Sequence, residues 1–170
     1  MRYLSEETKE RIVHFVDAYY ADNGYTPTIT EIAEDISNNA EIRKMLREFT
    51  MNYGSLSSKG TTEETSVYEN YYDFSEPIKK LKGHRVLAIN RGEKEGKLKV
   101  AIDAPSEAIL NYLFSEIVEN NGSKASKYVA RAVVDSYDRL IAPSVEREIR
   151  SDLFDTASEG AIKLFSENLK

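Results

Sequence analysis

The chain has 170 residues, enough for one ordinary domain or two small ones, and 41% of them are apolar, which suffices for a hydrophobic core. It has no cysteine, which excludes disulfides, thiolate zinc sites, iron–sulfur clusters and cysteine nucleophiles. The net charge of −6 argues against a protein that coats nucleic acid over its whole surface. No apolar run is long enough to span a membrane and no secretory signal opens the chain, so we expect a cytoplasmic protein.

Residues 1–54 are predicted to form three helices, a helix-turn-helix-like segment. The first helix follows a Ser5 cap and ends at Gly24, the usual type of helix stop. The second begins where Thr28 and Glu31 have the spacing of a capping box. The third is predicted to follow a polar cap and to end before Gly54, with an apolar inner face. Its outer face carries three candidate nucleic-acid-binding cations, Arg43, Lys44 and Arg47.

Residues 55–66 are predicted to be a linker to the remaining segment, 67–170, because SLSSKGTTEETS is small, polar and contains glycine. Four aromatic residues follow within seven positions: Tyr68, Tyr71, Tyr72 and Phe74. Such rings can stack on exposed bases. More often a cluster this dense anchors a short helix or turn onto a core, and we favour that interpretation.

The clearest strand signal lies in residues 84–103. We interpret 84–91 and 97–103 as two strands, joined by a turn that glycines bracket, because 97–103 alternates strictly between apolar and polar residues. The predicted fold class is therefore mainly α, a multi-helix domain with one β-hairpin at about 84–103.

The same region is strongly basic. Residues 79–99 carry eight cations against two acids, so the sequence predicts a basic hairpin on an acidic body. Such an element attracts a phosphate backbone or an acidic partner. Alternatively, the lysines keep an exposed hairpin soluble and protect its edges. The candidate nucleic-acid-binding residues here are Lys79, Lys80, Lys82, Arg85, Arg91, Lys94, Lys97 and Lys99.

Further helices are predicted after residue 103. One begins at Pro105, the next runs over about 123–141, and Pro143 is expected to interrupt the pattern before a last helix capped by Ser144. The apolar pattern is still periodic at Leu169, so we expect the helix to continue in a longer protein. Its apolar residues, Leu153, Phe154, Phe165 and Leu169, are expected to be covered by self-association if their partner is missing.

Motifs for catalysis are missing from the sequence. The two histidines, His14 and His84, have no zinc-protease spacing, and the chain has no nucleophile elbow, P-loop or dinucleotide-binding glycine motif. Adjacent acids such as Glu6 and Glu7 fall on polar helix faces, where solvation is their ordinary role. The sequence therefore predicts no enzyme, no metal site and no cofactor.

The opening of the chain, ERIVHFVDAYYADNGYTPTITEIAEDI, resembles the start of a LexA-type winged-helix domain over about residues 4–36. The resemblance is specific at NGY, residues 23–25, and at ITEIA, residues 29–33. It stops where recognition of DNA should begin, because Glu41 and the apolar face of the third helix favour packing over base contact.

A longer stretch, about 30–170, resembles the N-terminal helical region of the Tex family of bacterial transcription accessory proteins. The strings YYDFSEP, HRVLAINRGEKEG and RLIAPSVEREIR carry this resemblance, in the family's order. It implies a mostly helical cytoplasmic scaffold with an inserted hairpin, in a protein that binds nucleic acid and acts in transcription or RNA metabolism. It also implies following RNase-H-like, helix-hairpin-helix and S1 domains, which this chain lacks. The two resemblances overlap at 30–36, so the chain is either a divergent family member or a chimera.

Three functions remain open. The first is a scaffold and interaction region of a transcription accessory protein, with weak auxiliary contact to RNA or DNA through the basic hairpin. Its partners would include the transcription or RNA-processing machinery, and no membrane. The second is a sequence-specific DNA-binding helix-turn-helix module, and the third is a purely structural helical domain. We favour the first, because the longer motifs carry it.

Overall fold

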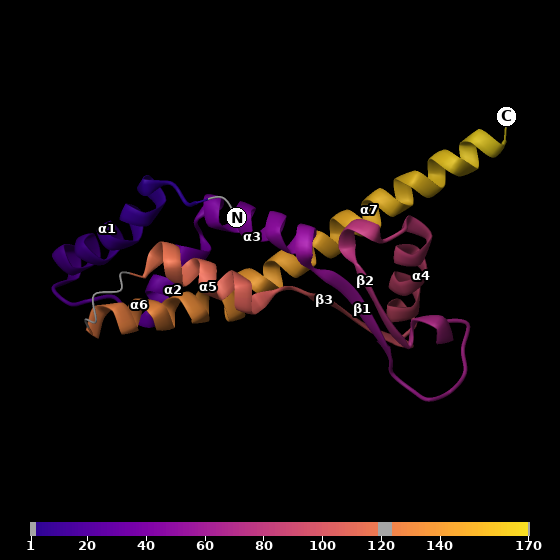
Figure 1. The fold of residues 1–170 in the computed structure, drawn as a ribbon, viewed down its shortest axis with the longest axis horizontal. Coiled ribbons are helices and arrows are strands. Elements are labelled where there is room, and N and C mark those ends of the chain that lie inside the picture. Colours follow the sequence, from indigo (N-terminus) through magenta and orange to yellow (C-terminus); the bar gives the residue numbers. More distant parts are fainter. Residues whose placement is uncertain (1–2, 119–123, 170) are drawn as a thin grey trace. The chain divides into compact units, whose positions relative to one another are not determined.

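The computed structural model describes residues 3–118 and 124–169 and divides into two compact units. Unit 1 comprises Met1–Phe49 and Pro105–Val145, and unit 2 comprises Thr50–Ala104 and Glu146–Lys170. Each unit is therefore built from two separate stretches, whereas the sequence suggests a contiguous division into 1–54 and 67–170. The fold is mainly α with one small antiparallel sheet, which confirms the predicted class (Figure 1).

Unit 1 is helical. It contains α1 (Glu6–Asn23), α2 (Ile29–Ser37), most of α3 (Ala40–Tyr53), α5 (Ser106–Ile117), α6 (Lys124–Asp135), the π-helical turn η3 (Ser136–Ile141) and the start of α7 (Ala142–Asn168). Helix α2 packs against α6 and η3. The core is aliphatic, and its largest fully buried aliphatic side chains are Ile32, Ile36, Ile42, Leu46, Ile109, Leu113, Val133 and Ile141.

Local capping explains where the first helices begin. Ser5 Oγ accepts a hydrogen bond from the Thr8 amide at 3.2 Å, and Gly24 ends α1 with a φ of 75°. Thr28 and Glu31 form a complete capping box at the start of α2. The side chain of Asn39 accepts hydrogen bonds from two amides of the first turn of α3. These three helix starts are confirmed within one or two residues.

Pro143 does not interrupt the last helices. Helix α7 already begins at Ala142, directly after η3. The amide of Ala142 donates to the carbonyl of Tyr137, five residues earlier, as in a π-helix. A proline in an α-helix lacks a donor and collides with the carbonyl four residues before it. The wider π turn over those residues relieves this conflict, so the helix continues through Pro143.

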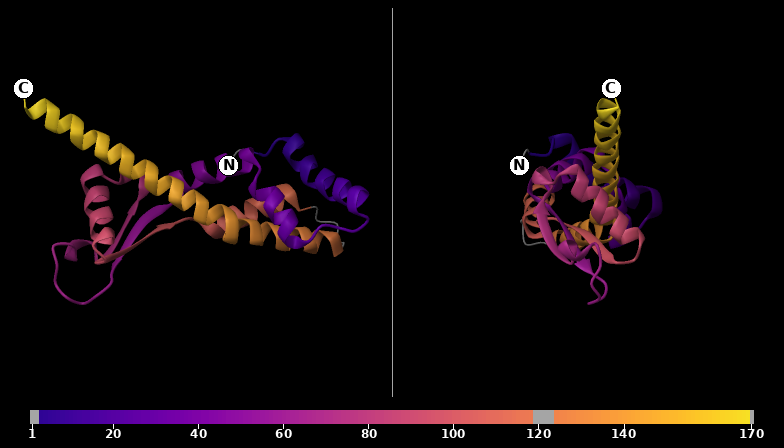
Figure 2. Two further views of the ribbon diagram at one scale, coloured as in Figure 1. Left: turned by 180° about the vertical axis from the view of Figure 1, so that it is seen from behind. Right: turned by 90° about the vertical axis from the view of Figure 1, so that its right-hand side faces the viewer.

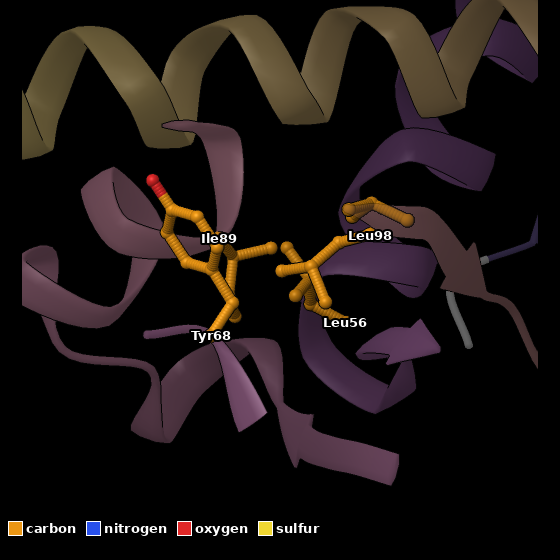
Figure 3. Close-up of a cluster of buried hydrophobic side chains, with 5 residues drawn as sticks. Leu56, Tyr68, Ile89 and Leu98 are labelled. Atoms are coloured by element: carbon orange, nitrogen blue, oxygen red, sulfur yellow. The ribbon is translucent and has the colours of Figure 1, made fainter. Parts of the chain in front are cut away.

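Unit 2 combines a three-stranded sheet with helices. The strands are β1 (Ser55–Gly60), β2 (Asp73–Pro77) and β3 (Leu98–Asp103), and they run side by side in the order β2-β1-β3 (Figures 1 and 2). The helical parts are η1 (Glu69–Tyr71), η2 (Ile78–Lys80), α4 (Gly83–Lys94) and α7 from residue 146. The core is formed by Leu56, Tyr68, Ile89, Leu98 and Val100. Figure 3 shows this cluster, with the first four of these residues labelled.

The linker prediction is wrong for residues 55–60, which form the central strand β1. This segment has few residues with strand propensity, but it pairs with β2 on one side and with β3 on the other. Leu56 and Ser58 are buried, and the Ser58 hydroxyl donates to the carbonyl of Tyr71 at 2.7 Å. Pairing with distant strands therefore decides the conformation here.

The predicted hairpin at 84–103 is also wrong in its first half, because residues 83–94 form α4. Val86, Ile89 and Gly92 are buried at a spacing of three, which is a helical period. The glycine-bracketed segment is a helix end: Gly96 has a φ of 70°, its amide donates to the carbonyl of Glu93, and the Lys97 amide donates to that of Gly92. This is the Schellman arrangement. Strand β3 is confirmed, but its partner is β1.

The aromatic cluster after β1 packs as predicted. Tyr68 belongs to the buried core, and Tyr71, Tyr72 and Phe74 are partly buried against it. The rings of Tyr71 and Phe74 meet edge to face, with centroids 5.4 Å apart. The hydroxyl of Tyr72 donates to the Glu64 carbonyl at 2.7 Å. These rings hold the β1–β2 connection on the sheet.

Candidate nucleic-acid interface

The predicted basic residues of unit 2 gather at the two ends of α4. At its N-terminal end, Lys79 and Lys80 lie on η2 and Lys82 is the N-cap residue of the helix. All three side chains are exposed, and none of them forms an ion pair with any residue in 3–118 or 124–169. Three uncompensated positive charges thus lie within four residues of chain.

The second group lies around the C-terminal end of α4. Arg91 donates to Glu95 at 2.9 Å, and this bond together with the Tyr68 hydroxyl holds the pKa of Glu95 below its usual range. Lys94 places its ammonium 5.2 Å from the centroid of the Phe154 ring. Half-buried Lys97 follows the helix end. Arg91 is therefore partly neutralised, while Lys94 stays positive beside an aromatic ring.

Two lysines face each other on the sheet. Lys99 on β3 lies directly opposite Lys59 on β1, and both side chains are exposed. Like charges at opposed positions repel each other, and a bound anion would relieve that repulsion. Lys59 is not among the candidates predicted from the sequence, because residues 55–66 are predicted there to be a linker. Only the pairing of β1 with β3 reveals the juxtaposition.

The Arg85 side chain contacts other residues of unit 2. Its guanidinium donates to both carboxylate oxygens of Glu76 at 2.8 Å and lies 5.9 Å from the centroid of Phe74. Both ion-pair partners are partly buried. This ion pair, in which the single nitrogen Nη1 donates to both oxygens, fixes α4 against β2 and leaves the Nε and Nη2 groups of Arg85 outside the pair.

The cations of α3 lie in unit 1, and their surroundings differ. Arg43 donates to the Ser37 carbonyl at 3.3 Å and to the Ser144 hydroxyl at 2.5 Å. Arg47 is half-buried, whereas Lys44 is exposed. Glu41 in the first turn of α3 accepts hydrogen bonds from Ser5. The N-terminal face, which a recognition helix uses to read bases, is thus engaged within unit 1.

Two concave surfaces of unit 2 lie between α4 and α7. The larger, about 560 Å³, is mainly apolar and includes Leu87, Leu153 and Leu164. The smaller, about 260 Å³, is polar and basic, and its lining residues are Asn90, Lys94, Arg147, Arg150, Ser151 and Phe154. Arg147 and Arg150 of α7 are not among the candidates predicted from the sequence. The spacings of three residues between them and of four residues from Arg150 to Phe154 nevertheless place all three side chains on one helix face.

Metal-ligating and nucleophilic groups do not gather in the part of the chain that the structure describes. Within residues 3–118 and 124–169, no group of three or more histidine, aspartate or glutamate side chains is placed to hold a metal ion. His14 is exposed on α1. His84 is exposed at the start of α4, where it lines the larger of the two concave surfaces. Over the same residues, no helix combines the length and the hydropathy needed to cross a bilayer.

Comparison with known proteins gives the family. A family model described as "Tex central region-like" matches residues 29–165, which is more than half of the chain. The chain belongs to this Tex family. The resemblance of residues 30–170 to Tex is thereby confirmed, and the comparisons do not support the LexA-type resemblance of residues 4–36.

Several relatives share this Tex region. The chain is 46% identical over 143 residues to the uncharacterized protein YdcI of Bacillus subtilis, a match that covers 82% of the chain and 20% of YdcI. It is 28% identical over 149 residues to the transcriptional accessory protein Tex of Neisseria gonorrhoeae, a match that covers 82% of the chain and 19% of that protein. It is 28% identical over 121 residues to human S1 RNA-binding domain-containing protein 1, a match that covers 67% of the chain and 12% of that protein. The chain thus spans about a fifth or less of the length of these relatives.

Proposed function

We propose that this chain is a non-catalytic scaffold and interaction region of a cytoplasmic transcription accessory protein, and that unit 2 makes auxiliary, non-specific contact with RNA or DNA. The observation that carries the proposal is the set of exposed lysines at the two ends of α4, with Lys79, Lys80 and Lys82 at one end and Lys94 at the other. The names of two relatives, a transcriptional accessory protein and an S1 RNA-binding protein, support it. The partners would be nucleic acid and the transcription or RNA-processing machinery.

The spacing of the lysine groups suits a phosphate backbone. Helix α4 has 12 residues, so its ends are about 18 Å apart. Lysines at both ends would contact phosphates that are not adjacent along a strand. A lysine ammonium binds a phosphate as a point charge and carries no base information, so the contact would be independent of sequence. The overall negative charge of the chain limits such contact to this region.

A sequence-specific helix-turn-helix module is the less favoured alternative. A recognition helix presents polar side chains at its exposed N-terminal face. In α3, Glu41 and Arg43 at that face make hydrogen bonds to residues of unit 1. A purely structural role remains the third alternative, and it predicts no binding at all.

Salt dependence of binding separates these functions. We expect the 170-residue chain to bind labelled single-stranded RNA and duplex DNA at low salt, with an affinity that falls steeply as salt rises. The charge reversals Lys79→Glu and Lys80→Glu together should weaken binding and flatten the slope of log K against log salt. The control combines Lys127→Glu and Lys163→Glu, which are exposed on α6 and α7 and change the net charge equally.

Each outcome is decisive. Equal losses in both double variants would show that only total charge matters, and would contradict an interface at α4. Undetectable binding at low salt would leave the structural role. Binding of one duplex sequence that survives the α4 reversals but fails with Lys44→Glu would favour the helix-turn-helix module.

We further propose that the end of α7 mediates self-association when no other partner covers it. Four large apolar side chains there are 61–72% exposed: Ile162, Leu164, Phe165 and Leu169. Exposed apolar side chains gathered on one short segment are typical of a contact surface. We expect the mass measured by light scattering to rise with concentration, and to do so less for Phe165→Ser. A constant monomer mass up to high concentration would contradict this.

A further inference from the structure

The small recess between α4 and α7 in unit 2 is built from donors on both helices. Helix α4 contributes Asn90 and Lys94, which are one turn apart. Helix α7 contributes Arg147, Arg150 and Ser151, and the ring of Phe154 closes one side. Every polar side chain that lines the recess can donate a hydrogen bond, and none of them is an acid.

The charge of the recess is positive after its ion pair is counted. Arg150 donates to Glu93, which balances one of the three cations. Arg147 is exposed and forms no ion pair with any residue that the structure describes. Lys94 lies over the Phe154 ring, which attracts its ammonium and keeps it near the recess without neutralising it. Two positive charges thus remain for a ligand.

The chemistry of the recess fits one phosphate of a nucleic-acid strand. A volume of about 260 Å³ is below the range of pockets that enclose drug-sized molecules. An arginine binds phosphate through two parallel N–H donors, and a lysine adds a point charge. The recess is shallow and open to solvent, and a flexible single strand can adapt its backbone to place one phosphate there more easily than a duplex.

We propose that this recess is a phosphate-binding subsite for single-stranded nucleic acid, in which Arg147 and Lys94 bind the phosphate while Asn90 and Ser151 add neutral donors. The inference rests on the proposed function and gives it a specific site. It places the strongest contact in a recess that combines Lys94 with Arg147, an arginine 53 residues further along the chain.

The test uses the whole 170-residue chain and a labelled 12-nucleotide oligouridine RNA, with affinity measured by fluorescence anisotropy at about 50 mM salt. We expect Arg147→Glu to weaken binding at least fivefold. The control Lys163→Glu makes the same charge change on the same helix, away from the recess, and should weaken binding less than twofold. Arg147→Gln should lower the salt slope by about 0.7, the value for one phosphate contact in a single strand.

A second measurement follows the recess directly. The side-chain amide of Asn90 should shift in NMR spectra when oligouridine is added to the wild-type chain, and should shift much less in Arg147→Gln. This readout does not depend on total charge. Thermal unfolding of each variant checks that the fold is retained, which we expect because Arg147 is exposed and unpaired.

The outcomes separate the subsite from the proposed function. Equal effects of Arg147→Glu and Lys163→Glu would overturn the subsite, while the lysine variants at residues 79 and 80 could still lose binding. No RNA binding by the wild-type chain would overturn both. Binding of an acidic peptide, but not of RNA, with the same dependence on Arg147 would overturn the nucleic-acid assignment and indicate a protein partner.

Discussion

Gly92 shows how one residue controls the packing of unit 2. It lies in α4, where a β-carbon would be 2.6 Å from Leu98 Cδ1 and 3.0 Å from Tyr68 Cδ1. Both neighbours belong to the buried cluster. The absence of a side chain therefore lets a strand residue and an aromatic ring touch the helix backbone.

We expect Gly92→Ala to lower the free energy of unfolding by about 1–3 kcal/mol, because overpacking displaces Leu98 and Tyr68. The matched control is Gly160→Ala in α7, where a β-carbon would meet nothing within 4 Å. Alanine there should raise stability by up to about 1 kcal/mol through helix propensity alone. Urea unfolding of both variants measures the difference. Stabilisation by both substitutions would contradict the close approach at Gly92.

At the scale of single elements, the start of α2 is joined to α1 through one carboxylate. Glu31 accepts hydrogen bonds from the Tyr19 hydroxyl at 2.6 Å and from the Thr28 amide at 2.7 Å. These bonds, the tyrosine's first, lower the pKa of Glu31 from its ordinary value. The ionised carboxylate is thus favoured in the folded state.

This lowered pKa predicts a loss of stability in acid. The contribution is fully present above the ordinary pKa of an unfolded glutamate and is lost as pH falls through the lower folded value. We expect Tyr19→Phe to reduce stability at pH 7 and to make the further loss between pH 7 and pH 4 smaller. Tyr20→Phe, at an exposed neighbour, should change neither. Urea unfolding at both pH values tests this, and identical pH dependence in Tyr19→Phe and wild type would contradict it.

The elements also show what a sequence reveals. Helices with local caps, such as α1 and α2, are predictable because the residues that start and stop them are neighbours in the chain. The conformation of residues 84–91 is ambiguous from the sequence, because a short apolar run is compatible with a strand or with a buried helix. The Schellman hydrogen bonds around Gly96, which mark a helix end, lie outside this run. Strand β1 cannot be recognised from its own sequence, because its pairing with β2 and β3 stabilises it.

The residues of the candidate site also divide into those that the local sequence reveals and those that only the fold brings together. The lysines at residues 79–82 are visible as a dense local run of charge. The recess is not, because Asn90 and Lys94 meet Arg147 only where α4 packs along α7. The opposition of Lys59 and Lys99 likewise depends on strand register. A sequence thus gives the charge of an interface, and long-range packing gives its shape.

At the scale of the whole molecule, each unit has its own buried core. Ile36 is fully buried in unit 1 and Ile89 is 1% exposed in unit 2. We expect Ile36→Ala and Ile89→Ala each to cost about 2–5 kcal/mol, since each leaves a cavity in a close-packed core.

Hydrogen exchange should show where each loss falls. Ile36→Ala should reduce protection chiefly in α2 and α6, and Ile89→Ala chiefly in α4 and the three strands. Native-state exchange followed by mass spectrometry resolves the two patterns. Uniform loss of protection along the whole chain in both variants would show instead that the two units unfold as one.

The alternation of the two units along the chain sets the order in which they can be completed during synthesis. The strands and α4 leave the ribosome before the second half of unit 1, but Leu153, which packs on their core, is added only after that half is finished. The synthesis of unit 1 begins first, but its core cannot be completed until residue 145 has left the ribosome. The nascent chain therefore holds two incomplete cores at once and closes them in succession, unit 1 before unit 2.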